Sequence, residues 1–143
     1  MKYEEMFAFT VTEVKECLEY IGKTYKVFQR EDKVEFLLKF TDRVICNVTV
    51  DRGDENIPDA MLSTMVTGFS DDSMTVEPYS YEESVVESGD VNRMVGEMFT
   101  EAERYDIFLQ RCERLLRKMD KLCKEYGVDM NVIVTIENLD IHI

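Results

Sequence analysis

The first apolar pattern in the chain predicts a helix over about residues 11–21. Its apolar residues recur at the 3.6-residue period of a helix, namely Val11, Val14, Cys17, Leu18 and Ile21. Thr10 and Glu13 have the spacing of a capping box at the start of this segment. Gly22 suits the left-handed residue that ends many helices.

The period then shortens to two, which predicts strands. Tyr25 and Val27 begin the first strand, and two further runs follow polar turns with alternating apolar residues at Val34, Phe36, Leu38, Phe40, Val44, Cys46, Val48 and Val50. Three consecutive runs of this kind predict a three-stranded antiparallel meander with one buried face.

The next segment predicts a short central helix followed by strands. Pro58 suits the first position of a helix, and the apolar residues after it are spaced as on one helix face, at Met61, Leu62, Met65, Val66 and Phe69. Asp71 and Asp72 form a turn, and further strands are expected from Met74 and from Tyr79.

The longest pattern covers about residues 91–126. Its apolar positions step by fours and threes over five heptads, like the a/d seam of a coiled coil. One interpretation is a continuous helix that pairs with a second copy through the seam candidates Val95, Met98, Tyr105, Leu109 and Leu116. The other is two helices with a break near Phe99 and Thr100, because Gly96 weakens the interior of a helix.

An apolar strand over about residues 130–143 ends the chain, and it needs the edge of the meander or a partner chain to pair with. These elements predict a single α+β domain over residues 1–143. An antiparallel sheet would pack with an N-terminal helix, a short central helix and a long C-terminal helix, and a final strand would follow.

The negative charge is concentrated in the middle of the chain. The formal net charge is −13, and residues 51–90 hold eleven acidic side chains against Arg52 alone, which gives −10 there. This balance argues against direct binding to nucleic acid and against docking on an anionic membrane. The N-terminus is acidic where a signal peptide would be apolar, and the four cysteines lack metal-site spacing, so we expect a cytoplasmic protein.

Catalytic and cofactor signatures are missing from the sequence. The single histidine, His142, lies one residue from the end of the chain, where a catalytic base is not expected, and no glycine-rich phosphate loop occurs. The carboxylates from Asp51 to Asp59 lack the spacing of a calcium-binding EF-hand loop. We therefore expect no catalytic residue, no cofactor and no metal site.

The sequence instead predicts a surface that binds another protein. Flexible methionines and leucines bordered by carboxylates suit such a surface. The residues expected to form it are Met61, Leu62, Met65, Phe69, Asp71, Asp72, Glu82 and Glu83.

The expected order of elements over residues 11–126 resembles the fold of small acidic type III secretion chaperones, which the YbjN-like proteins share. The resemblance rests on element order, size and acidity, and no motif residue carries it. It implies a homodimer that binds an unstructured segment of another protein.

Three functional hypotheses follow from the sequence. The first is a non-enzymatic protein-binding module that is chaperone-like or adaptor-like. The second is a small acidic inhibitor of the phage type, which mimics the charge of nucleic acid. The third is an enzyme that uses carboxylates, alone or with a divalent ion.

Overall fold

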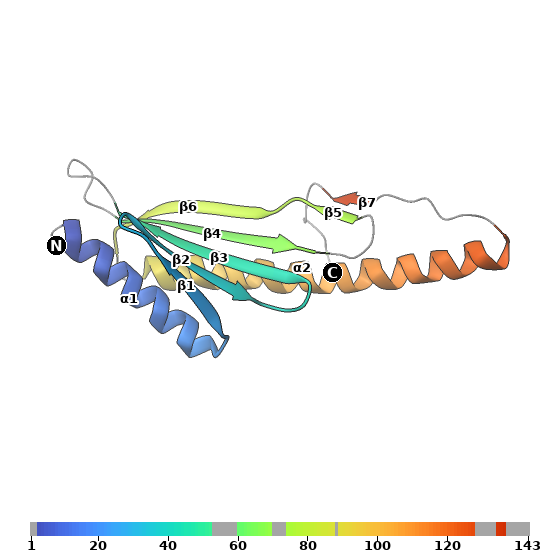
Figure 1. Cartoon of the computed structure of the whole chain (residues 1–143), viewed down its shortest axis with the longest axis horizontal. Coiled ribbons are helices and arrows are strands. Elements are labelled where there is room, and N and C mark those ends of the chain that lie inside the picture. The colour runs from blue at the N-terminus through green and yellow to red at the C-terminus, as the bar shows by residue number, and fades with distance from the viewer. Residues whose placement is uncertain (1–2, 53–59, 70–73, 88, 128–133, 137–143) are drawn as a thin grey trace.

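The computed structural model describes residues 3–52, 60–69, 74–87, 89–127 and 134–136. Figure 1 shows a sheet that lies along one long helix, with a second helix beside it. The fold class is α+β, as the sequence predicts.

The N-terminal helix α1, Tyr3–Ile21, begins earlier than predicted. Thr10 is no N-cap, because it lies inside the helix, fully buried, and its hydroxyl donates to the carbonyl of Met6 at 2.7 Å. Phe7 extends the buried row of Val14 and Leu18 by two turns, which accounts for the longer helix. Gly22 ends α1 with a φ of 77°, so the predicted left-handed residue is confirmed.

The predicted meander is confirmed. It consists of β1 (Tyr25–Gln29), β2 (Lys33–Lys39) and β3 (Val44–Asp51), which pair antiparallel in sequence order. Two further antiparallel strands complete a five-stranded sheet in the order β1-β2-β3-β4-β6, namely β4 (Ala60–Gly68) and β6 (Tyr79–Val85).

The predicted short central helix is wrong, because β4 occupies its place. Ala60, Leu62, Thr64 and Val66 alternate into the core, so the period is two. The buried Thr64 hides this alternation from a count of apolar residues. Two neighbouring strands, β3 and β6, hydrogen-bond to β4, and such pairing overrides a weak local preference for helix.

The long helix α2, Asp90–Glu125, is continuous, and the alternative break near Thr100 does not occur. The Thr100 hydroxyl donates to the carbonyl of Gly96 one turn earlier, and the helix runs straight through this point. Figure 1 shows that α2 continues well past the ends of β2, β3 and β4.

Both helices pack on the same face of the sheet. Val14 and Leu18 of α1 and Met94, Met98 and Leu109 of α2 share one buried cluster with the inward side chains of β2, β3 and β4. Leu109 is the last residue of α2 that belongs to this cluster. The sheet therefore has one covered face, and the second half of α2 extends beyond the core.

An ion pair fastens the β2–β3 turn to α2 just after Leu109. The Arg43 guanidinium donates to both carboxylate oxygens of Glu113 at 2.8–3.0 Å, which is the strong two-pronged arrangement. Thr41 adds a hydrogen bond of 2.7 Å from its hydroxyl to the carboxylate of Asp106. These contacts fix where the helix leaves the sheet.

The remaining strands form a small pair outside the main sheet. The predicted strand from Met74 is β5, Met74–Val76, and it pairs in parallel with β7, Val134–Ile136. The terminal strand was expected to pair with the edge of the meander or with a partner chain, and its described residues pair instead with β5 of the same chain. The other positions predicted for that strand lie outside the described residues.

Substitutions at two glycines that lie on or beside α2 should change the unfolding free energy in opposite directions. A Cβ at Gly68 would lie 3.0 Å from Leu109 Cδ1 and 3.2 Å from Tyr105 Cδ1, whereas a Cβ at Gly96 would meet nothing within 4 Å. We expect Gly68→Val to lower the unfolding free energy by about 1–3 kcal/mol through overpacking. We expect Gly96→Ala to raise it by about 1 kcal/mol through helix propensity.

Denaturant unfolding followed by circular dichroism measures both changes. A Gly68→Val variant as stable as the wild type would show that the end of β4 does not pack closely on α2. A Gly96→Ala variant that loses stability would show that α2 is not a regular helix at this point.

Candidate functional site

One face of the five-stranded sheet carries no helix among the described residues, and we call it the open face. Side chains alternate along a strand, so the residues between the core positions point to this side. Its apolar side chains come from four adjacent strands and are Phe28, Leu37, Ile45, Met61 and Met65. Phe28 is 47% exposed and Met65 is 42% exposed, and the other three are half-buried.

Short polar side chains separate these apolar residues. Leu37, Asn47, Met65 and Ser80 form one row across four strands, and Thr49 and Ser63 belong to the next row. A patch of this kind exposes apolar side chains without forming one contiguous hydrophobic surface, so it suits reversible contact with another molecule.

The structure divides the predicted partner-binding residues among different places. Met61, Met65 and Glu82 lie on the open face. Leu62 lies in the core at 0% exposure, and Phe69 follows β4 at 46% exposure. Asp71 and Asp72 lie outside the described residues.

Glu83 faces the covered side of β6 and is already engaged there. Its carboxylate accepts a hydrogen bond of 2.6 Å from Arg93 of α2 and one of 3.0 Å from the Tyr81 hydroxyl. These donors, Arg93 first, lower the pKa of Glu83. The residue ties β6 to α2, and Glu82 is the neighbour that faces outward.

The predicted dimer-seam residues all lie in the interior of the single chain. Val95, Met98, Tyr105, Leu109 and Leu116 are between 0% and 6% exposed. The first four belong to the cluster beneath the sheet. The heptad spacing of α2 therefore serves packing within one molecule along this part of the helix.

A basic pocket of about 570 Å³ lies at the β1 corner of the open face. Leu37 and Ile45 contribute apolar side chains to its lining, and Lys23, Lys26 and Lys39 contribute three cations without a lining carboxylate. Lys23 is held by its contact with the carbonyl of Phe40 at 3.0 Å, and Lys39 pairs with Asp42 at 3.1 Å. The pocket is a local site of positive charge on an acidic protein.

Sequence reasoning missed Leu37 and Ile45. Each lies between two core residues of an alternating run, so its side chain had to point away from the core. The alternation that identifies the buried face of the meander also places Leu37 and Ile45 on the opposite face.

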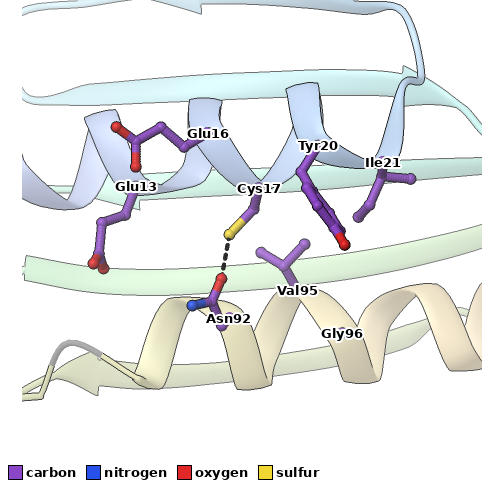
Figure 2. A pocket seen from close by; sticks show the side chains of 8 residues that line it. All are labelled: Glu13, Glu16, Cys17, Tyr20, Ile21, Asn92, Val95 and Gly96. Atoms are coloured by element: carbon purple, nitrogen blue, oxygen red, sulfur yellow. Dashed lines mark hydrogen bonds between the residues drawn. The ribbon is translucent and has the colours of Figure 1, made fainter.

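A second cleft, of about 330 Å³, lies between α1 and α2. Figure 2 shows Glu13, Glu16, Cys17 and Tyr20 of α1 along one side, with Asn92 among the α2 residues opposite. The Cys17 thiol donates to the Asn92 side-chain oxygen at 2.7 Å, and this bond bridges the two helices.

The environment of Cys17 disfavours its thiolate. Partial burial and the nearby carboxylates of Glu13 and Glu16 raise the pKa of the thiol. The thiolate is the nucleophile in cysteine chemistry, so Cys17 is a weak one at neutral pH. The pKa of Glu13 is also raised, by burial first and then by Glu16 and Asp90. In this cleft the pKa values of Cys17 and Glu13 are both shifted in favour of the protonated form.

Other candidate chemistry finds little support in the described part of the chain. His142, Asp54, Glu55 and Asp59 lie outside it. Within it, no group of three or more histidine, cysteine, aspartate or glutamate side chains is arranged so that it could hold a metal ion. No helix there is both long and apolar enough to cross a membrane.

Comparison of the chain with protein-family models, with curated proteins and with solved structures finds no match. The predicted resemblance to secretion chaperones stays a prediction. The element order on which it rests includes a helix where the structure has β4.

The protonated state of Cys17 can be measured by alkylation. In a Cys112→Ser/Cys123→Ser background, Cys17 is the reactive thiol, because Cys46 is buried. We expect iodoacetamide to react with Cys17 more slowly at pH 8 than with a free small thiol. Glu13→Gln/Glu16→Gln should accelerate the reaction severalfold, because loss of the negative charges lowers the pKa of the thiol.

Glu19→Gln is the matched control, since Glu19 lies on α1 but does not contribute to the shift at Cys17. The rate as a function of pH gives the pKa of the thiol. A pKa at or below that of a free thiol would contradict this description of the cleft.

Proposed function

We propose that this protein is a non-enzymatic binding module that takes an unstructured apolar segment of another protein on the open face of its sheet. The observation that carries the proposal is the placement of Phe28, Leu37, Ile45, Met61 and Met65 on a sheet face that no helix of the described residues covers. Flexible thioethers adapt to varied apolar partners, and Met61 and Met65 both project from β4 onto this face.

The basic pocket supports a preference within this class of partner. Lys23, Lys26 and Lys39 surround apolar side chains at one end of the open face. A segment with an acidic side chain next to an apolar anchor complements this end. Charge complementarity of this kind fixes orientation and register more than it raises affinity.

A non-enzymatic role also agrees with the chemistry of the cleft between the helices. Cys17 is held as a thiol, and its hydrogen bond to Asn92 joins two structural elements. The group with the clearest nucleophilic potential in that cleft thus supports the fold.

Two carboxylates of the acidic segment, Glu83 and Asp90, are engaged within the fold, which counts against a nucleic-acid mimic. Glu83 pairs with Arg93, and the Asp90 carboxylate accepts hydrogen bonds from the backbone amides of Val86 and Glu87 at 2.9 Å. These groups hold β6 and the start of α2 in place. They are not free to imitate a row of phosphates.

The open face can be tested with reduced, carboxymethylated α-lactalbumin, which stays unfolded. We expect the chain to bind it, with an affinity that changes little between 50 and 500 mM NaCl, because apolar burial is not screened by salt. Ile45→Thr/Met65→Thr should weaken binding about tenfold or more, since each side chain loses apolar area at the contact. Threonine suits a strand, so the sheet is retained.

Val27→Thr is the control, because Val27 is an exposed β1 residue whose side chain lies on the other side of the sheet. Leu62 is excluded from the test, since its truncation would damage the core. Unchanged binding in the double variant would refute the open face as the site. A steep loss of affinity with salt would assign binding to charged groups such as those of the basic pocket, and not to the apolar side chains.

A further inference from the structure

The second half of α2 carries more apolar side chains than the sheet can cover. Leu109 and Leu116 are buried on its inner side. A neighbouring set steps by fours and threes along the helix, and we call it the outer row: Phe108, Cys112, Leu115, Met119, Leu122 and Tyr126. This spacing keeps the side chains on one face of a helix.

The outer row is accessible where α2 extends beyond the core. Leu115 is 58% exposed, Leu122 is 53% exposed, and Tyr126 is 79% exposed. The other three members of the row are half-buried. Figure 1 shows this end of α2 well beyond the ends of the main strands. An apolar row with heptad spacing is the surface on which a second helix packs.

A basic row borders the outer row on one flank only. Arg111, Arg114, Lys118 and Lys121 are all exposed, and each directly precedes a member of the outer row. Glu125, which precedes Tyr126 at the end of α2, is the one carboxylate in this set of flanking positions. Among the described residues, no acidic side chain forms an ion pair with the four basic side chains. Four cations together on a protein of net charge −13 are a marked local reversal of sign.

The opposite flank offers no matching negative charge for a second copy. Its carboxylates are Glu113, which Arg43 holds, and Asp120, which pairs with Lys124 at 2.9 Å. Two antiparallel copies would place basic row against basic row. Two parallel copies would place the basic row against carboxylates that are already neutralised. Flanking charges select coiled-coil partners, so they disfavour self-pairing here.

We infer that the second half of α2 binds an amphipathic helix of a different protein, one with acidic residues along the flank of its apolar row. The outer row supplies the apolar contact, and the basic row supplies specificity and orientation. Nucleic acid would leave the outer row unused. This site is separate from the open face and does not rest on the function proposed for it.

The test uses a synthetic helical peptide of four heptads with leucine at the a and d positions and glutamate at the e and g positions. Its like charges prevent it from pairing with itself. A second peptide carries glutamine at e and g, and a third carries lysine. Fluorescence anisotropy of each labelled peptide with the full chain measures the dissociation constant at 50 mM NaCl.

We expect the glutamate peptide to bind about tenfold or more tightly than the glutamine peptide, because several flanking ion pairs act together. Leu115→Gln/Leu122→Gln should abolish binding. The Arg111→Glu/Lys118→Glu variant should no longer bind the glutamate peptide and should bind the lysine peptide instead. Loss of folding would not produce this reversal of preference. Lys15→Glu/Arg30→Glu changes the net charge equally, away from α2, and should leave the preference unchanged.

Several results would overturn the inference. One is equal binding of the glutamate and glutamine peptides, and another is no binding of either. Tighter binding to vesicles containing anionic phosphatidylglycerol, or to duplex DNA, would assign the basic row to a different ligand. A homodimer that Leu115→Gln/Leu122→Gln dissociates would make a second copy the occupant. Ile45→Thr/Met65→Thr should leave peptide binding intact, which separates this site from the open face.

Discussion

The packing of α2 along β3 and β4 is the contact on which the rest of the structure depends. A helix packs on a sheet through one row of side chains, and in α2 this row includes Met94, Met98 and Leu109. Because α1 lies on the same side, the opposite face of the sheet stays open. Because the sheet ends before the helix does, the last turns of α2 stay outside the core. The open face and the outer row of α2 are therefore both consequences of how α2 packs on the sheet.

Much of the fold could be read from the sequence because its signals are periodic and local. The meander has strict alternation, and Gly22 marks the end of α1. The error at β4 has a clear physical cause: Thr64 is a polar residue at a core position, so the apolar residues nearby mimic a helical spacing. The pairing of this segment with β3 and β6, which lie outside the segment itself, identifies it as a strand.

The candidate site was harder to predict than the fold. Met61 and Met65 both lie on the open face, but the helical interpretation added Leu62, which is a core residue. Exposure depends on which face of an element is covered, and that is set by tertiary contacts. The heptad pattern of α2 illustrates the same limit, since a seam that suits a coiled coil serves equally to pack a helix on a sheet of its own chain.

The continuity of α2 has an energetic consequence for any partner of its outer end. A short isolated helix is marginal in water, because its first turn is costly to nucleate. Here the nucleus is supplied by the turns packed on β3 and β4, and the rest propagates from them past the Arg43–Glu113 ion pair. The outer turns are thus already helical before a partner binds, so binding costs little conformational entropy in this chain.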